Sequence, residues 1–369
     1  MHQLMSRDPQ PSEHLDFPCQ GCGSNLEFKP GSQHLECPYC GLTQSLEREI
    51  SKPIVEYSFN EALARHRKGR SDALRTDGRI VACQECGAHT VVTGSASRCA
   101  FCQAPVVLVQ EEGEQFLPDS VLPFGVEAKR AQEIFRRWIA TRWFAPSDLS
   151  RHAQRDGVSG IYLPYWTYDS RTTTQYAGLR GDHYYVTESY NDAQGQSRSR
   201  RIQKTRWTPS AGVVHVDFDD VLVPATRSLP RDKLDALEPW DLKALEPYAP
   251  AFLAGFAAER YAIDLEDGFQ RAHDRMEPEV RAKIRSAMGG DVQTITSMQV
   301  SYADVTFKHC LLPLWISAFR YKHKVYRFLV NARTGEASGE RPYSAVKIAL
   351  TALVCALLVA LFAYWQSNT

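Results

Sequence analysis

The first third of the chain contains four CxxC motifs: Cys19-Gln-Gly-Cys22, Cys37-Pro-Tyr-Cys40, Cys83-Gln-Glu-Cys86 and Cys99-Ala-Phe-Cys102. Residues 23–36 separate the first two motifs, and residues 87–98 separate the last two. A CxxC turn directs two thiolates toward one point, and a second turn from a facing hairpin completes a tetrahedron. The spacing therefore predicts two successive four-cysteine units, at residues 17–50 and 81–110.

Four thiolates at this spacing are typical of a structural zinc site, which leaves no position open for water and stabilises a fold without catalysing a reaction. We expect two structural Zn²⁺ ions in two rubredoxin-like zinc ribbons. The predicted ligands are Cys19, Cys22, Cys37 and Cys40 in the first ribbon and Cys83, Cys86, Cys99 and Cys102 in the second. Disulfides, redox-active CxxC motifs and an iron–sulfur cluster are the alternatives. A reducing compartment argues against disulfides, and the lack of a surrounding βαβ pattern argues against redox-active motifs. The regular spacing favours zinc over an iron–sulfur cluster.

The C-terminal end is strongly apolar. From Ile348 to Trp365 the sequence is IALTALVCALLVALFAYW, without a charged side chain. Since about 20 apolar residues cross a bilayer, we predict a transmembrane helix at residues 345–366. A buried core helix at the chain end is the alternative; apolar residues on all faces and the length of the run favour the membrane span.

The flanking residues predict the orientation of this helix. Arg341 and Lys347 flank the near side of the apolar run Ile348–Trp365, and Tyr364 and Trp365 lie near its far end, where aromatic rings prefer the membrane interface. The positive-inside rule then places the N-terminal bulk in the cytoplasm. Residues 1–17 lack the apolar core of a signal peptide. We therefore expect a single-pass, tail-anchored protein of the cytoplasmic membrane whose thiols face a reducing compartment.

Between the ribbons and the tail, the pattern predicts an α+β body. Apolar residues at helical spacing predict a helix within residues 127–144, stopped before Pro146. Aromatic and β-branched residues predict a strand at 161–168, and several short strands follow between 172 and 218. Residues 229–289 are expected to be helical, with an apolar helix at 251–261 and a new helix starting at Pro278.

The resulting multidomain prediction has antiparallel strands in the body and seven segments. They are a disordered lead (1–16), the first ribbon (17–50), a linker with a short helix (51–80), the second ribbon (81–110), a linker (111–122), the α+β domain (123–343) and the transmembrane helix (345–366). Leu163-Pro-Tyr-Trp166 and Leu312-Pro-Leu-Trp315 resemble each other, which suggests an internal duplication of the α+β domain.

Two basic stretches are candidate contacts for an anionic ligand such as nucleic acid or lipid. The first contains Arg65, Arg67 and Lys68, and the second contains Arg198, Arg200, Arg201, Lys204 and Arg206. The spacing by two places many of the second set on one strand face. The alternatives are a solvated helix end for the first stretch and a hairpin edge protected from aggregation by its charge for the second. Asp217, Asp219 and Asp220 indicate a turn near a strand end.

The composition and the motifs give little indication of an enzyme. The 369 residues include 43 basic and 43 acidic side chains, so the chain lacks the basic excess of a dedicated nucleic-acid-binding protein. It contains no GxxxxGK[ST], HExxH, GxSxG or dinucleotide-binding GxGxxG motif. We expect neither a bound nucleotide nor a catalytic site.

Several further stretches resemble a family of bacterial membrane-anchored double-zinc-ribbon proteins. Besides the two ribbons they are Phe144–Pro146, Ile161–Trp166, Leu237–Leu242, Leu253–Phe256, Leu312–Trp315 and Tyr326–Gly339. Members are often labelled as replication-restart helicase-like or transcription-factor-IIB-type zinc-ribbon proteins, and some are encoded beside phage-shock-protein A homologues and stomatin/flotillin-type proteins. This chain departs from the family pattern at Lys322-His-Lys324 and Asn331–Glu336, away from the cysteines. The missing P-loop argues against helicase activity.

The sequence thus predicts a non-enzymatic adaptor, or scaffold, that recruits protein partners at the cytoplasmic face of a membrane. The resemblance implies partners from envelope-stress or stomatin/flotillin-type systems. The alternative is a membrane-associated nucleic-acid-binding protein linked to replication or transcription. An enzyme of unrecognised type ranks third.

Overall fold

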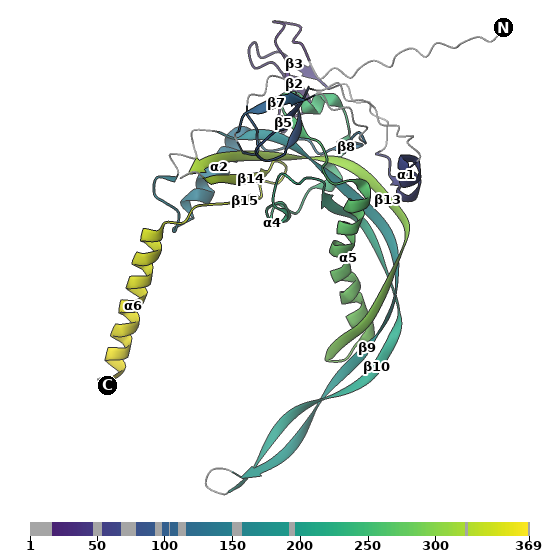
Figure 1. Cartoon of the computed structure of the whole chain (residues 1–369), viewed down its shortest axis with the longest axis vertical. Helices are drawn as coiled ribbons and strands as arrows, with labels where there is room; N and C mark the ends of the chain where they lie inside the picture. The colour runs from purple at the N-terminus through teal and green to yellow at the C-terminus, as the bar shows by residue number, and fades with distance from the viewer. Residues whose placement is uncertain are drawn as a thin grey trace, which may run out of the picture.

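The computed structural model describes residues 17–46, 54–67, 79–92, 98–102, 104–109, 116–149, 157–191, 196–321 and 324–367. These residues form an α+β fold whose strands are mainly antiparallel. Figure 1 shows the cysteine-rich units on one side of the body and an apolar C-terminal helix on the other. The expected lead, residues 1–16, lies outside the described ranges.

Three long strands dominate the body: β9 (Ser159–Asn191), β10 (Ser197–Pro224) and β13 (Val292–Tyr321). Strand β9 pairs antiparallel with β13 along one edge and with β10 along the other. The prediction of several short strands between 172 and 218 was wrong, because β10 and β13 provide ladder partners that keep β9 extended through its polar stretches. Pairing with β13 ends at Gly181, and beyond it residues 182–191 and 197–206 form a two-stranded hairpin, here called the arm.

The long strands contain β-bulges on both sides of β9. The register shifts between Phe218 and Val221 in β10 and between Ala303 and Thr306 in β13. Asp220 therefore lies in a bulge with φ of 51°, and not in the expected turn. A bulge bends a strand and increases its twist, which accounts for the curvature of this sheet in Figure 1.

A buried lysine lies beside the β10 bulge. The ammonium of Lys308 is 2.7 Å from Asp220 and 3.1 Å from Glu56. Burial alone would lower the pKa of Lys308, but the two carboxylates raise it. A buried cation left without partners costs several kcal/mol, so this pairing connects the segment between the ribbons to the body.

Shorter strands complete the main sheet. Its order is β11 (Glu246–Pro247), β8 (Ser120–Val121), β13, β9, β12 (Ala257–Glu259), and then the strands of the second cysteine unit. Strands β4 (Tyr57–Ser58) and β14 (Lys324–Asn331) pair with β13, and β15 (Ala337–Gly339) pairs with β14.

The two Leu-Pro-x-Trp motifs lie side by side in the centre of this sheet, where Leu163 pairs with Leu312. Each motif belongs to the first strand of a hairpin, β9–β10 or β13–β14. The first motif lies near the start of β9, far from the β9–β10 turn, whereas the second lies near the end of β13, close to the β13–β14 turn.

The helices only partly match the prediction. Helices α1 (Phe59–Arg67) and α2 (Ala128–Ala140) form in the expected regions. The expected helix at 251–261 is wrong, because Gly255, with φ of 82°, separates a 3-10 turn (Pro250–Leu253) from strand β12. Between β10 and Pro250, the helical segments are the short helix α4 (Arg231–Asp235) and a 3-10 turn (Leu242–Ala244), and strand β11 follows them.

Helix α5 (Leu265–Met288) is continuous, so the prediction of a new helix at Pro278 was also wrong. Its N-cap is Asp264, whose carboxylate accepts a hydrogen bond from the Asp267 N–H at 2.8 Å. Val280 and Ile284, beyond the proline, continue the buried stripe of the first half. Packing against the concave side of the long strands therefore outweighs the hydrogen bond that proline cannot donate.

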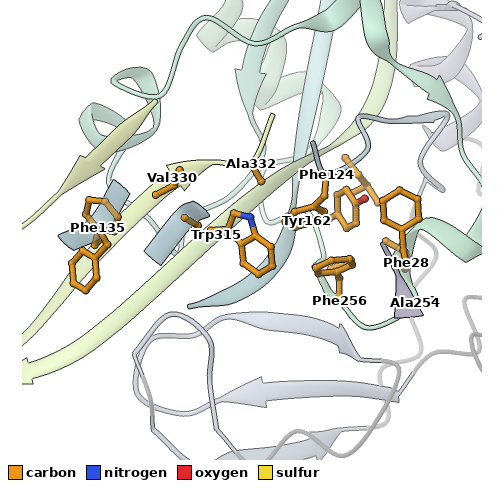
Figure 2. Packing of buried hydrophobic residues seen from close by; sticks show 14 of the residues in the cluster. Phe28, Phe124, Phe135, Tyr162, Ala254, Phe256, Trp315, Val330 and Ala332 are labelled. Carbon is orange, nitrogen blue, oxygen red and sulfur yellow. The ribbon is translucent and has the colours of Figure 1, made fainter. Parts of the chain in front are cut away.

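The buried side chains form three clusters. One lies around helix α5 and the long strands, and a second lies beneath the second cysteine unit. The third extends from Phe28 in the first cysteine unit through Phe124, Phe256 and Trp315 to Phe135 of α2 (Figure 2). Phe124 and Phe256 stack with centroids 4.0 Å apart. The first cysteine unit and the body therefore share one hydrophobic core.

The C-terminal helix α6 (Ala345–Ser367) projects away from the body (Figure 1). The most apolar 18 consecutive residues within Ala345–Gln366 have a mean hydropathy of 2.5, and none of them is buried against the rest of the chain. This helix is long and apolar enough to cross a membrane. The alternative of a buried core helix does not hold within this chain.

Candidate metal centres

The first cysteine unit consists of strands β1 (Glu27–Phe28), β2 (His34–Glu36) and β3 (Thr43–Ser45) and two tight turns. In each turn a glycine directly follows the second cysteine. Gly23 and Gly41 have φ of 75° and 73°, and their N–H groups donate to the carbonyls of Cys19 and Cys37 at 2.8 and 3.0 Å. Glycine adopts this conformation without steric cost, so each CxxC turn closes and its two thiols point the same way.

The four thiols of this unit converge. Cys19 Sγ lies 3.5 Å from Cys40 Sγ, and Cys22 Sγ lies 3.5 Å from Cys37 Sγ. All four sulfurs lie within 4.8 Å of one another. A disulfide needs about 2.05 Å between its sulfurs, whereas zinc with Zn–S bonds of about 2.3 Å separates its tetrahedral ligands by roughly 3.8 Å. The geometry therefore suits a shared metal ion and excludes bonded pairs.

The second unit repeats this arrangement on strands β5 (Arg79–Cys83), β6 (His89–Val92) and β7 (Val106–Val109). Cys83 Sγ lies 3.4 Å from Cys102 Sγ, and Cys86 Sγ lies 3.6 Å from Cys99 Sγ. Gly87 has φ of 71° and donates its N–H to the Cys83 carbonyl at 2.9 Å. The equivalent position in the fourth turn is Gln103, which lies outside the described residues.

The surroundings of the thiols favour a bound cation. The Ser24 hydroxyl, 3.1 Å from Cys37 Sγ, and nearby backbone N–H groups lower the pKa of Cys37 to about 6. In the second unit, contact with the Cys99 thiol and burial raise the pKa of Cys86. Four thiolates this close repel one another unless a cation lies between them. Each group of four cysteines could therefore hold one metal ion.

The two units differ in how they join the body. In the second unit, Val91 of β6 pairs with Ala258 of β12, so the unit continues the main sheet. Phe101, between the cysteines of the fourth motif, is fully buried, and its carbonyl accepts a hydrogen bond from Arg327 Nε at 2.8 Å. This motif therefore packs into the body and offers little free surface.

The first unit joins the body through one face and exposes the other. Its Phe28 and Gly31 N–H groups donate to the carbonyls of Ala254 and Phe124 at 2.9 and 2.8 Å. On the outer face, Cys22 and Cys40 are exposed. Tyr39 is 82% exposed and Leu42 is 40% exposed. We call Tyr39, Cys40 and Leu42 the outer knuckle.

The first basic stretch does not form a cluster within the described residues. Arg65 lies in α1, 3.6 Å from Glu61 one turn earlier. Arg67 is the last residue of α1, and Lys68 lies outside the described residues. Helix α1 lies near the body, far from the arm in Figure 1. The part of the first basic stretch that the structure describes therefore does not meet the second stretch.

The second basic stretch lies on the arm. Arg198, Arg200, Lys204 and Arg206 share one face, where they lie opposite Tyr190, Glu188, Tyr184 and Asp182, and Arg201 lies on the other face.

Most of these cations already have neighbours on the arm. Lys204 lies 3.0 Å and Arg200 lies 3.8 Å from Glu188. Arg201 and Arg206 lie over the rings of Tyr185 and Tyr184, at 4.2 and 5.4 Å. The arm therefore presents interleaved cations and aromatic rings, with acidic side chains among them.

Sequence inspection missed two features that the structure shows. The outer knuckle was not predicted because the sequence does not show which CxxC motif faces solvent. The aromatic Tyr39 within its motif is the one local indication of a binding surface there. The pairing of Lys308 with Glu56 and Asp220 joins residues far apart in sequence, and no local pattern indicates it.

Comparison with known proteins gives one informative similarity. The chain is 23% identical over 337 residues to a protein of Bacillus subtilis (strain 168) described as "Uncharacterized protein YdjG", and the alignment covers 91% of this chain and 92% of that protein. No protein-family model matches the chain. No solved structure matches it. The similarity thus extends over nearly the whole length of both proteins, but the name of the relative gives no activity.

Proposed function

We propose that the protein is a non-enzymatic, membrane-anchored adaptor that holds two structural zinc ions and recruits a protein partner through the outer knuckle. The observation that carries this proposal is the exposure of the outer knuckle on the first cysteine unit, whose strands β2 and β3 lie on the side of the body opposite α6 (Figure 1). With α6 in a membrane, the knuckle faces the aqueous phase and is free to bind. Exposed aromatic residues are frequent anchors of protein interfaces.

The zinc assignment is supported by the donor set. Four thiolates in a tetrahedral arrangement select zinc or iron–sulfur chemistry over magnesium or calcium, and spacing of this ribbon type favours zinc. Metal analysis of the purified chain should give about two zinc ions per chain. Purified protein with reduced thiols and no bound metal, or with iron and labile sulfide, would contradict the assignment.

The membrane assignment is supported by the exposed apolar surface of α6 and by the residues at its start. Lys347 donates to the Ala145 carbonyl at 2.8 Å and lies over the ring of Trp143. Arg341 and Lys347 precede or begin the span, and positive side chains favour the cytoplasmic side. We therefore place the ribbons and the body in the cytoplasm.

The adaptor function is tested by capturing partners with the full chain solubilised from membranes. The double variant Tyr39→Ala with Leu42→Ala alters the outer knuckle but keeps all eight cysteines. Val55→Ala with Val213→Ala is the matched control, because these residues are 49% and 53% exposed elsewhere on the chain. We expect wild type and control to retain a partner that the knuckle variant loses, and the purified partner to bind with the same pattern. The same partners on all three proteins would contradict the proposal.

The resemblance noted in the sequence suggests phage-shock-protein A homologues and stomatin/flotillin-type proteins as the first partners to examine. Purified candidates of both types can be tested against the same three proteins.

A second candidate function is binding of nucleic acid at the membrane, favoured by the cations and aromatic rings of the arm. Binding through several phosphates would weaken steeply as salt increases. A gel-shift titration of the full chain in detergent, with single-stranded and duplex DNA and RNA, tests it. No shift, or a shift independent of salt, would remove this candidate.

A further inference from the structure

The body contains a cavity of about 650 Å³ next to the start of α6. Helices α2 and α4, the β14–β15 hairpin and the segment that leads into α6 form its walls. Tyr343, two residues before α6 begins, belongs to the lining. This volume lies in the range of sites that hold small molecules.

The cavity has an excess of positive charge. Four cations line it, Arg142, Lys233, Lys324 and Arg341, against two acidic residues, Asp232 and Glu340. Lys233 forms an ion pair with Asp232 at 3.1 Å. Within the described part of the chain, the other three cations have no carboxylate within ion-pair distance. The cavity therefore has the charge of a site for an anion.

Aromatic rings hold these three cations in place without using their hydrogen-bond donors. Arg142 lies over Trp138 at 4.9 Å, Lys324 over Tyr326 at 5.5 Å and Arg341 over Tyr343 at 5.2 Å. In addition, Arg142 Nε is buried and has no hydrogen-bond partner among the described residues. A phosphate oxygen is a strong acceptor for such donors.

The cavity is fixed relative to the membrane helix. The Ser344 N–H donates to the Phe144 carbonyl at 2.8 Å, and Lys347 Nζ donates to the Ala145 carbonyl at 2.8 Å. Both acceptors lie just after α2, whose Trp138 lines the cavity. Beside them, Trp143 is 73% exposed, as expected for a ring at the membrane interface. If α6 spans the bilayer, the cavity lies in the headgroup layer, which occupies the outermost 5–8 Å or so of each leaflet.

We propose that this cavity binds the phosphate headgroup of an anionic phospholipid in the leaflet that α6 enters. The proposal rests on the membrane placement of α6 given under the proposed function, but not on the adaptor function. The phosphate satisfies Arg142, Lys324 and Arg341, and the exposed ring of Trp143 lies beside the acyl boundary. A lipid is favoured over a dissolved anion because the cavity adjoins the membrane-entry point of α6.

The test uses the full chain reconstituted into phosphatidylcholine vesicles that contain phosphatidylglycerol. Spin-labelled phosphatidylglycerol and phosphatidylcholine report the relative association of each lipid with the protein. The double variant Arg142→Gln with Lys324→Gln removes two charges from the cavity. Lys243→Gln with Lys283→Gln removes two charges from exposed positions elsewhere and is the matched control.

We expect wild type and control to prefer phosphatidylglycerol, and each cation removed from the cavity to reduce this preference about fivefold. Thermal unfolding shows whether the double variant is folded, and Arg341→Gln alone gives a second, milder perturbation of the cavity. An unchanged preference in both cavity variants, or an equal loss in the control, would overturn the proposal.

Two further outcomes separate the underlying assumptions. If the full chain does not float with the vesicles, the membrane placement of α6 fails, and the lipid site fails with it. If the chain floats but excess inorganic phosphate abolishes the preference, the cavity recognises a free anion and the lipid assignment is wrong. Neither outcome bears on capture of a protein partner by the outer knuckle.

Discussion

The attachment of the first ribbon to the body depends on Phe28, which leads to a quantitative prediction. Phe28 is 2% exposed and lies in the core cluster shared by the ribbon and the body (Figure 2). Its ring packs edge-on against Phe252 with centroids 5.4 Å apart. Truncation of a buried phenylalanine to alanine costs about 3–5 kcal/mol. The variant Phe28→Ala should therefore weaken the contact between ribbon and body by this amount.

The effect should be confined to the ribbon, because the metal ligands and the body sheet are left intact. If the attachment opens as a local unit, the opening equilibrium rises by about two to four orders of magnitude, since 1.4 kcal/mol corresponds to a factor of ten. Hydrogen exchange measured by mass spectrometry should show faster exchange in peptides from Phe17–Leu46. Peptides from α5 should be unchanged, and metal content should remain that of wild type.

The matched control is Tyr39→Ala, which removes an aromatic ring that is 82% exposed on the same ribbon. Its effect on stability should stay within about 0.5 kcal/mol. Unchanged exchange in Phe28→Ala, or equal acceleration in both variants, would show that buried packing does not hold the ribbon to the body.

Three further predictions concern the body and the arm. A Cβ added at Gly268 would approach the Tyr168 hydroxyl and come within 2.8 Å of Trp166 Cδ1. Urea unfolding of Gly268→Ala should therefore show a loss of about 1–3 kcal/mol in the free energy of unfolding. This loss outweighs the gain of about 1 kcal/mol that alanine brings in helix propensity. Burial raises the pKa of Glu259 to about 7, so the folded chain holds an extra proton between about pH 4.5 and 7 and loses stability as the pH rises through that window. Glu259→Gln should abolish this dependence of the free energy of unfolding on pH, and at about pH 8 it should be more stable than wild type by up to about 3 kcal/mol. The same pH dependence in the variant would contradict its assignment to Glu259. The arm and α6 extend from the same side of the body (Figure 1), but an open, charged hairpin cannot enter hydrocarbon. An impermeant maleimide added to the ribbon side of sealed vesicles should therefore label Ser199→Cys. Peptide mapping distinguishes this label from label on the exposed Cys22 and Cys40, and labelling of residue 199 only from the opposite side would refute the prediction.

The two four-cysteine groups and helix α6 were predictable because each depends on residues close together in the sequence. A CxxC turn, its glycine and the convergence of two turns involve residues close in sequence, so local spacing predicts the two four-cysteine groups. Eighteen-residue windows of apolar composition likewise define α6 without reference to the rest of the chain. The α+β class with mainly antiparallel strands was also confirmed.

The errors occurred where distant partners determine the local structure. Strand β9 stays extended where several short strands were predicted, because β10 and β13 complete its hydrogen bonds. Helix α5 passes through Pro278 because Val280 and Ile284 pack on the sheet. Strand β12 replaces an expected helix because β9 and β6 lie on either side of it.

The sequence alone determined the eight clustered thiols and the apolar helix, because the chemistry of each is contained within a short segment or a repeated turn. Only the tertiary structure decided which ribbon joins the sheet and which exposes its knuckle. It also brought Arg142, Lys324 and Arg341 from three separate segments to one cavity beside α6. Such placements depend on contacts between residues distant in sequence, and packing, not local propensity, determines those contacts.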